Sequence, residues 1–341
     1  ESNGNGAVTV EIRRHGEPKA LPVFEPRKGW EELPPETLAA IFRDTGLVLT
    51  GAGEETVLAR TARCAGARTL VVNACEPEPY ITCEQVLTMS HPVEILRGAE
   101  LLRKACGAEK ILFAAESSNL EMIELIKSKI YFLKWAHVEV RAVPPVYPQG
   151  LEKTLLRAWF PGEEKGAVVF PASTVFAAYE AVALQKPFFE RVVTVGGECV
   201  VEPRSLWLSL GTSLQDAIRT CKGTMREPKA VLVGGPMAGR AETLLEMPLT
   251  PGANAVLALP PEVMWEGAAQ PCIRCNRCVE HCPVALSPVM ITLAAERQEF
   301  ALAREWDPED CIACGNCSYV CPSKRPMVEL LRAVREEASY G

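Results

Sequence analysis

The chain has 341 residues, of which 48% are hydrophobic and 23% charged, a composition that is ordinary for a globular protein with two or three domains. Its formal net charge of -7 gives no basic footprint and argues against a nucleic-acid partner. No apolar run is long enough to cross a bilayer, which argues against direct membrane insertion.

The chain begins Glu1-Ser2-Asn3, with neither an initiator Met nor a signal-peptide pattern, which suggests that it lacks the start of a longer protein. From about Leu38 helical and extended segments alternate, and this alternation predicts a parallel sheet covered by helices, hence an α/β domain. Extended segments are predicted at residues 69–73, 110–114 and 137–143. Helices are predicted at residues 35–42, 56–65 and 92–106, and from a capping box that runs from Ser118 to Glu121.

Two loops that follow predicted strands carry clustered polar side chains. The first contains Asn73, Glu76, Glu78 and Tyr80, and the second, residues 147–153, contains Gly150 and Glu152. Ligands of open α/β sheets bind where strands end, so both loops are candidate binding segments. Taken alone, they are better explained as proline-stiffened loops with solvated carboxylates.

Residues 189–218 change character and predict a small β-rich module. Residues 191–195 and 205–209 are short extended segments, and a helix is expected from Ser213. A further strand, residues 230–233, runs into the tight turn Gly234-Gly235-Pro236-Met237. This turn is a poor match to a phosphate-binding glycine loop.

Eight of the fourteen cysteines crowd between Cys272 and Cys321, in two runs of the form C-x2-C-x2-C-x3-C-P. This is the spacing of bacterial ferredoxins, in which the fourth Cys of each run ligates the other cluster. Two [4Fe–4S] clusters are therefore predicted. One would be held by Cys272, Cys275, Cys278 and Cys321, and the other by Cys311, Cys314, Cys317 and Cys282.

Zinc is the competing interpretation of these thiols, but structural zinc sites usually pair two short C-x2-C knuckles rather than two complete runs. His281 beside the first run is expected to be a surface residue or a neighbour of a ligand. The remaining cysteines are expected to be small buried hydrophobes: Cys64, Cys75, Cys83, Cys106, Cys199 and Cys221.

Several of these segments together resemble the C subunit of the Rnf electron-transport complex, whose relatives include the flavin-bearing NADH-oxidising subunit of respiratory complex I. The matching segments are residues 72–74, 78–82, 147–150, 190–195, 234–237 and 311–326. The resemblance runs from about Leu33 to the end of the chain. It implies a Rossmann-like flavin/NADH-type domain, a small β-grasp domain of the soluble-ligand-binding (SLBB) type and an α-helical two-cluster ferredoxin domain.

The resemblance places these domains at residues 33–187, 188–260 and 261–341, after a tail of a barrel-sandwich domain in residues 1–32, around Val8 to Arg13. It also implies contacts to FMN and NADH from the polar loop residues: Asn73, Glu76, Glu78, Tyr80, Gly150 and Glu152.

The chain departs from the family pattern in two places. Thr50-Gly51-Ala52-Gly53-Glu54-Glu55-Thr56 stands where the family has a longer Gly-rich flavin loop, and acidic side chains repel a phosphate unless they point outward. Pro171-Ala172-Ser173-Thr174 stands where the family has Asn-Val-Gly-Thr, and Pro lacks the amide donor. FMN binding and NADH binding therefore both stay open.

The leading hypothesis is an electron-transfer subunit that passes electrons between a flavin or partner redox protein and two [4Fe–4S] clusters. Its expected partners are the other subunits of a redox complex, with a ferredoxin or flavoprotein among the candidates. We expect a cytoplasmic protein that is peripheral to any membrane complex. Two alternatives stand beside it: an FMN-dependent NADH:acceptor oxidoreductase, and a docking adaptor that presents Glu54 and Glu55 to a larger complex.

Overall fold

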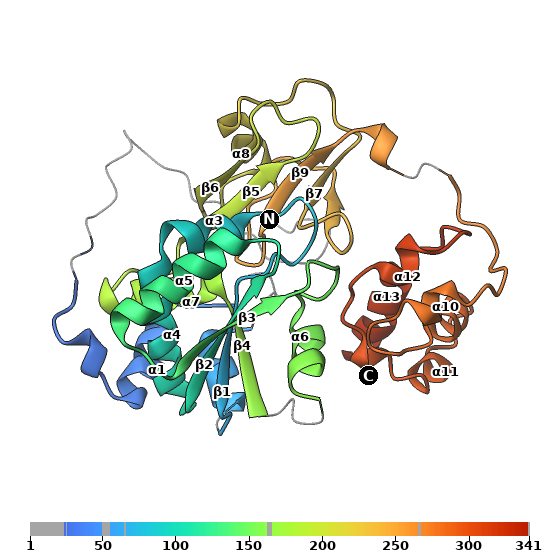
Figure 1. Ribbon diagram of the computed structural model, residues 1–341. Helices are drawn as coiled ribbons and strands as arrows, with labels where there is room; N and C mark the ends of the chain where they lie inside the picture. The colour runs from blue at the N-terminus through green and yellow to red at the C-terminus, as the bar shows by residue number, and fades with distance from the viewer. Residues whose placement is uncertain are drawn as a thin grey trace.

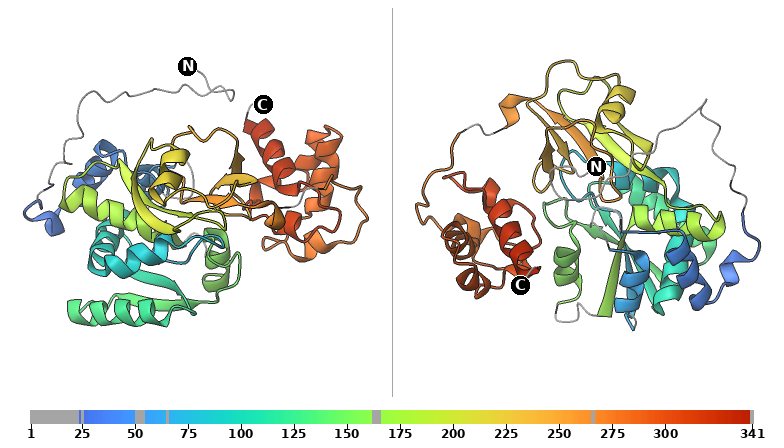
Figure 2. Two further views of the ribbon diagram at one scale, coloured as in Figure 1. Left: turned by 90° about the horizontal axis from the view of Figure 1, so that it is seen from above. Right: turned by 180° about the vertical axis from the view of Figure 1, so that it is seen from behind.

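The computed structural model describes residues 24, 26–49, 55–64, 66–161, 166–264 and 267–339. Figure 1 shows three parts in chain order: an α/β part, a second sheet, and a helical part at the C-terminal end. In both views of Figure 2 the helical part stays to one side of the α/β part. The expected tail of a barrel-sandwich domain, around Val8 to Arg13, falls outside the described residues.

A four-stranded sheet of order β3-β2-β1-β4 forms the centre of the α/β part, and every pairing in it is parallel. Its strands β1, β2 and β4 are buried along most of their length, as uninterrupted apolar strands covered on both faces should be. The strands are β1 (Thr69–Asn73), β2 (Lys110–Glu116), β3 (Val138–Val143) and β4 (Ala167–Pro171).

Helices cover both faces of this sheet. The larger core packs β1, β2 and β4 against α1, α4 and α7, while Leu155 and its neighbours from α6 cover the other face with Val71, Leu112 and Val169. The helices are α1 (Pro35–Asp44), α2 (Val57–Arg63), α3 (Cys83–Ser90), α4 (Pro92–Cys106), α5 (Leu120–Leu133), α6 (Glu152–Trp159) and α7 (Ala172–Ala183), after the 3-10 turn η1 (Trp30–Glu32).

The second sheet has the order β6-β5-β9-β7-β8, with a parallel β5–β9 pair among antiparallel neighbours. Helix α8 (Leu214–Thr220) follows β6 and is capped by Ser213, whose hydroxyl accepts the amide of Asp216 at 3.0 Å. The strands are β5 (Glu190–Gly196), β6 (Arg204–Ser209), β7 (Ala230–Val233), β8 (Arg240–Glu242) and β9 (Ala255–Leu259).

The helical part repeats one design twice. Each cysteine run leads into a single helical turn and then, after a Pro-containing turn, into a longer helix with a shared apolar core. Left-handed residues recur at equivalent places in the two runs: Arg274 and Ala313, Asn276 and Gly315, Ala285 and Lys324. The elements are η3 (Pro261–Val263), α9 (Arg277–Glu280), α10 (Pro288–Glu296), α11 (Phe300–Arg304), η4 (Pro308–Asp310), α12 (Asn316–Tyr319) and α13 (Met327–Ser339).

Two local expectations need correction. Asn119, not Ser118, caps α5, because its side chain accepts the amide of Met122 at 3.1 Å. Glu152 and Lys153 begin helix α6 rather than ending a loop. Within the described ranges, no helix is both long and apolar enough to span a bilayer.

Candidate functional site

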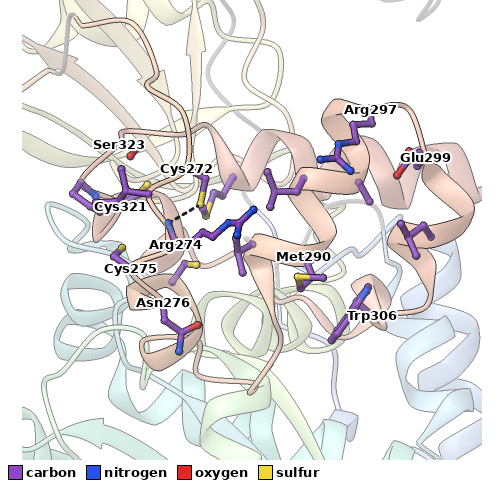
Figure 3. Close-up of a pocket in the computed structure, with 18 residues that line it drawn as sticks. Cys272, Arg274, Cys275, Asn276, Met290, Arg297, Glu299, Trp306, Cys321 and Ser323 are labelled. Atoms are coloured by element: carbon purple, nitrogen blue, oxygen red, sulfur yellow. Dashed lines mark hydrogen bonds between the residues drawn. The ribbon is translucent and has the colours of Figure 1, made fainter.

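The predicted cluster ligands gather at two places in the helical part. Cys272, Cys275, Cys278 and Cys321, here cysteine set A, line one cavity of about 500 Å³. Figure 3 shows Cys272, Cys275 and Cys321 at one end of the cavity, with Met290 and Trp306 toward the other. The fourth cysteine of the set comes from the other run, as the ferredoxin spacing predicts.

Cys282, Cys311, Cys314 and Cys317, here cysteine set B, line a second cavity of about 20 Å³. Here too the fourth residue, Cys282, is supplied by the other run. The space is narrow, so these side chains have to spread when they hold a group larger than a water molecule. The structure thus brings together both groups of four cysteines, while their role as ligands stays a prediction.

Backbone amides already point at several of these sulfurs. The amide of Arg274 lies 3.4 Å from the Cys272 sulfur, and that of Ala313 lies 3.3 Å from the Cys311 sulfur. Both donors sit at the left-handed residues of their runs. Burial raises the pKa of the Cys317 thiol to about 12, so this cysteine needs a bound cation to ionise near neutral pH. The donor chemistry suits iron–sulfur clusters.

A single metal ion fits this part of the chain less well. Among the described residues, no three His, Cys, Asp or Glu side chains converge on one point closely enough to hold an ion. A cubane keeps its four thiolates further apart than a zinc ion does, because the sulfurs bind different corners. The iron–sulfur interpretation thus rests on the spacing of the two cysteine runs.

The segments that follow β1 and β3 bring the predicted flavin and nicotinamide contacts to the carboxyl edge of the sheet. Asn73 donates its side-chain amide to the carbonyl of Gly150 at 2.7 Å and accepts the amide of Cys75 at 3.2 Å. A Cβ at Gly150 would lie 2.8 Å from the carbonyl oxygen of Glu76. Both residues therefore have structural roles in joining the two loops.

Glu76 lies in a cluster of carboxylates. Its Oε1 accepts the amide of Gln85 at 2.7 Å, while its buried Oε2 has no hydrogen-bond partner among the described residues. Burial, followed by the nearby charges of Glu84 and Glu116, raises the pKa of Glu76 to about 8. Glu76 therefore carries a proton over most of the neutral range. Glu76 and Glu116 border a cavity of about 270 Å³.

Glu78 reaches into the second sheet rather than toward a vacant site. Its Oε2 accepts the amides of Met237 at 2.7 Å and Ala238 at 3.0 Å. These amides belong to residues 234–239, here called the bridging turn. The glycine-rich turn, a poor match to a phosphate loop, thus binds a carboxyl group that the chain itself supplies.

Tyr80 and Glu152 also have partners within the chain. The hydroxyl of Tyr80 donates to Glu198 at 2.5 Å. Glu152 accepts the guanidinium of the buried Arg60 at 2.8 Å, and Glu55 accepts the same group at 2.6 Å. Burial alone would lower the pKa of Arg60, but the two carboxylates raise it above its ordinary value, so Arg60 stays charged.

The altered segment Pro171–Thr174 forms the start of α7, and a carboxylate covers it. Glu84, which is buried, accepts the backbone amide of Ser173 at 2.7 Å and its hydroxyl at 2.5 Å. Burial raises the pKa of Glu84 even though these bonds and the buried Arg191 act the other way. The helix terminus where an anionic ligand would be stabilised is thus occupied by a side chain of the protein.

These contacts bear on the fit of FMN. At this edge two groups of backbone amides, in the bridging turn and at the start of α7, already bind carboxylates. The remaining candidate for the phosphate, residues 50–54, lies outside the described residues. Neither of these two groups of amides is therefore open to a flavin phosphate in this structure. A cleft of about 960 Å³ nearby is lined by Glu78, Tyr147, Leu151, Arg240 and Arg332.

The remaining sequence expectations concern single residues. Five of the six scattered cysteines are buried, and Cys64 is half-buried. His281 is exposed and lies 3.0 Å from the carbonyl of Arg277 through its Nδ1. Sequence reasoning missed Arg60 and Glu84, because each gains its role from partners far away in the chain. The signal in the sequence that could have indicated them is a charged residue at a helix position where an apolar one is expected.

Models of three protein families match successive parts of the chain. They are the Nuo51 FMN-binding domain over residues 44–177, the SLBB domain over residues 192–241 and a 4Fe-4S dicluster domain over residues 265–323. The predicted fold class, with these three domain types in this order, is confirmed. The residue boundaries predicted for the domains stay a prediction.

The chain is also similar to curated proteins along most of its length. The C subunit of a proton-translocating ferredoxin:NAD(+) oxidoreductase complex from Clostridium ljungdahlii is 30% identical, over 96% of this chain and 74% of that protein. The C subunit of an ion-translocating oxidoreductase complex from Rhodobacter capsulatus is 33% identical, over 84% of this chain and 57% of that protein. The chain thus spans little more than half of the second relative.

Solved structures with the same fold include an NAD+-reducing [NiFe]-hydrogenase in its H2-reduced state. The match has a TM-score of 0.62 at 18% sequence identity and covers 96% of this chain and 68% of that one. At this identity the similarity shows the fold alone.

Proposed function

The chain belongs to the family of C subunits of the Rnf-type oxidoreductase complexes, and from this premise we propose that it relays electrons through two [4Fe–4S] clusters held by cysteine sets A and B. The single observation that carries the proposal is the gathering of eight cysteines into two groups of four, each completed by the other run. When bound, such clusters supply one-electron redox chemistry.

The chain's own residues contribute placement and shielding. Each set has two buried cysteines, Cys314 and Cys317 in set B and Cys278 and Cys321 in set A, but the exposed Cys275 belongs to set A. Amide donors to sulfur, such as those of Arg274 and Ala313, stabilise thiolate charge and are one of the means by which a protein sets a cluster's potential. We also propose domain boundaries near residues 33, 188 and 261.

The partners we propose are other subunits of a redox complex, with a ferredoxin or a flavoprotein as the external carrier. The relative from Clostridium ljungdahlii is a subunit of a ferredoxin:NAD(+) oxidoreductase complex, and this supports the assignment. The proposal includes a peripheral place on the cytoplasmic side of such a complex, because both relatives named above are subunits of ion-translocating assemblies.

The ligand assignment is tested by Cys314→Ser in full-length, anaerobically purified protein. We expect the electron paramagnetic resonance signal of one cluster to disappear or change, while the other persists. Cys106→Ser, which alters a buried cysteine of the α/β part, is the matched control and should leave both signals unchanged. Two unaltered signals in the Cys314 variant would overturn the assignment of set B.

A second candidate function is NADH:acceptor oxidoreduction with FMN. The match to the Nuo51 FMN-binding domain favours it, and the cleft of about 960 Å³ falls within the usual size range of small-molecule sites. The test is an anaerobic absorption spectrum before and after NADH, with flavin extracted from the same sample. Extractable flavin and bleaching by NADH support the enzyme, whereas reduction by dithionite alone leaves a relay supplied by a partner.

The third candidate, a docking adaptor, loses part of its support. Glu55 was expected on a docking surface, but it pairs with Arg60 at 2.6 Å and with Arg63 at 2.9 Å. A carboxylate held by two guanidinium groups contributes little to recognition of a partner. Glu54 lies outside the described residues.

A further inference from the structure

The bridging turn touches both neighbouring parts of the molecule. On one side, its amides bind Glu78 of the α/β part, and a Cβ at Gly235 would lie 2.4 Å from that side chain. On the other side, Arg332 of α13 donates to the carbonyl of Ala238 at 2.5 Å. The second sheet therefore connects the loop after β1 to the helical part.

The contact with the helical part falls on the loop of cysteine set B. A Cβ at Gly315 would lie 2.1 Å from the carbonyl oxygen of Met237, so the residue after Cys314 can only be glycine while the bridging turn stays in place. Tyr147, from the loop after β3, donates its hydroxyl to the carbonyl of Cys314 at 2.5 Å. The same peptide unit is thus held from two directions.

The internal repeat shows that this feature is particular to one run. Asn276 is the counterpart of Gly315, and both residues are left-handed, with φ of 63° and 80°. Asn tolerates this backbone conformation, so conformation alone does not require glycine in the second run. The close approach of Met237 does require it. The difference between Asn276 and Gly315 therefore marks the run whose loop packs against the bridging turn.

Set A has a different environment. Its Cys275 is exposed, and its cavity is bordered by Ile273, which is 65% exposed, and by the partly exposed Met290 and Trp306. Large apolar side chains at such a rim are common where another protein docks.

We propose that Tyr147 and the bridging turn are positioning elements that fix set B against the carboxyl edge of the sheet, which makes set B the inner redox site and set A the outer one. This inference rests on the proposed relay function and adds which cysteine set faces the sheet and which faces an external carrier. Electrons exchanged with a flavin at the carboxyl edge of the sheet pass at set B, and those exchanged with an external one-electron carrier pass at set A. Neither transfer forms or breaks a covalent bond, and neither moves a proton.

The hydrogen bond from Tyr147 also has an electronic consequence. In a trans peptide the C=O and N–H groups point in opposite directions. Because Tyr147 holds the carbonyl of Cys314, the amide of Gly315 in the same peptide is held on the side away from Tyr147, and Gly315 borders the cavity of set B. Amides directed at a cluster stabilise its reduced, more negative form. Loss of the hydroxyl should lower the potential of this site alone.

The test uses the full chain with both clusters and measures two midpoint potentials, with signals assigned through the Cys314→Ser variant. Tyr147→Phe should lower the potential of the set B signal and leave that of set A unchanged. Tyr131→Phe, at a side chain that is 86% exposed, is the matched control and should change neither. Unchanged potentials in Tyr147→Phe, or an equal shift of both, would overturn the proposal.

A second pair of variants tests the packing independently by amide hydrogen exchange. Gly315→Asn keeps a residue that tolerates the left-handed conformation but should collide with Met237, so protection should fall in residues 234–239 and 311–319. Asn276→Gly makes the mirror change in set A and should leave residues 234–239 as protected as before. Equal protection of this turn in both variants would contradict the packing argument. If the wild-type chain held no clusters, the relay function itself would be contradicted. If it held two clusters but the variants had no selective effect on set B, only this inference would be contradicted.

Discussion

Arg60 and Glu152 form an ion pair at the edge of the parallel sheet, with Nη1 of the guanidinium 2.8 Å from Oε1 of the carboxylate. The same nitrogen lies 3.3 Å from the carbonyl of Val169 in the edge strand β4. One buried cation thus joins α2, β4 and the start of α6. The residue expected to touch a cofactor, Glu152, has a structural role.

We expect Arg60→Met to lower the free energy of unfolding of the α/β part by about 2–4 kcal/mol, because it leaves the carboxylates of Glu55 and Glu152 without their buried counter-charge. Arg63→Met is the matched control: Arg63 also pairs with Glu55 but its side chain is 63% exposed, so its loss should change stability by less than about 1 kcal/mol. Denaturant unfolding followed by circular dichroism measures both. Equal losses in the two variants would contradict the role given to Arg60.

The pH dependence of stability should reveal Glu76. Its pKa is raised from 4.5 to about 8 in the folded chain, so between these values the folded state binds more protons than the unfolded state. The contribution of Glu76 to stability is therefore most favourable below pH 4.5 and declines as the pH rises toward 8. Each unit of pKa shift corresponds to about 1.4 kcal/mol, and partial exposure makes the full value an upper limit.

Glu76→Gln keeps a side-chain oxygen that can accept the amide of Gln85 but does not titrate, so it should remove this decline. Thermal unfolding of wild type and variant between pH 5 and pH 8 should show a gap that widens with pH in favour of the variant. Glu109→Gln, at an exposed position, is the control and should follow the wild type. A gap that is constant with pH would argue against a raised pKa.

Gly98 should not tolerate a side chain although it lies inside helix α4. An alanine usually stabilises a helix interior by about 1 kcal/mol relative to glycine. Here a Cβ would lie 2.1 Å from the carbonyl oxygen of Val175 in α7, and overpacking of this kind costs about 1–3 kcal/mol or more. We expect Gly98→Ala to destabilise the chain on balance, as measured by denaturant unfolding. Gly166→Ala, where nothing lies within 4 Å, should be nearly neutral, and a stabilised Gly98 variant would contradict the close packing of α4 and α7.

Cluster removal should affect one part of the molecule selectively. Cys278, Cys317 and Cys321 belong to the core of the helical part, so emptying the sites should loosen that core. We expect amide exchange to accelerate in α10 and α13 after oxidative cluster loss, with β1 and β2 unchanged. Acceleration throughout the α/β part would show that its stability depends on the clusters.

Local patterns were the part of the structure that sequence could predict. Residues 69–73 and 92–106 match β1 and α4 in their bounds, since an apolar strand and a helix between Pro92 and Gly107 are determined by neighbouring residues. Helix α7 was missed because it is buried on nearly all sides and shows no amphipathic period.

In the candidate site, too, local features could be predicted from the sequence and long-range contacts could not. The spacing of the cysteines is a local property, and it predicted both groups of four. The acceptance of two amides by Glu78, by contrast, depends on Met237 and Ala238 in another domain. No spacing along the chain indicates that contact, so Glu78 was interpreted as a ligand contact. The same holds for Tyr147, whose partner Cys314 is in the third domain.

The strand order β3-β2-β1-β4 has a consequence for synthesis of the chain. Strand β1 pairs on one side with β2, which follows it, but on the other with β4, where Thr69 faces Ala167. A nascent chain that has produced only three strands therefore presents β1 as an open apolar edge, the kind of surface that pairs with other chains. This edge stays unpaired until residues 167–171 have left the ribosome, and because non-local pairing is slow, it stays exposed for some time afterwards. The interval before β4 arrives is thus the period when the chain is most prone to aggregate.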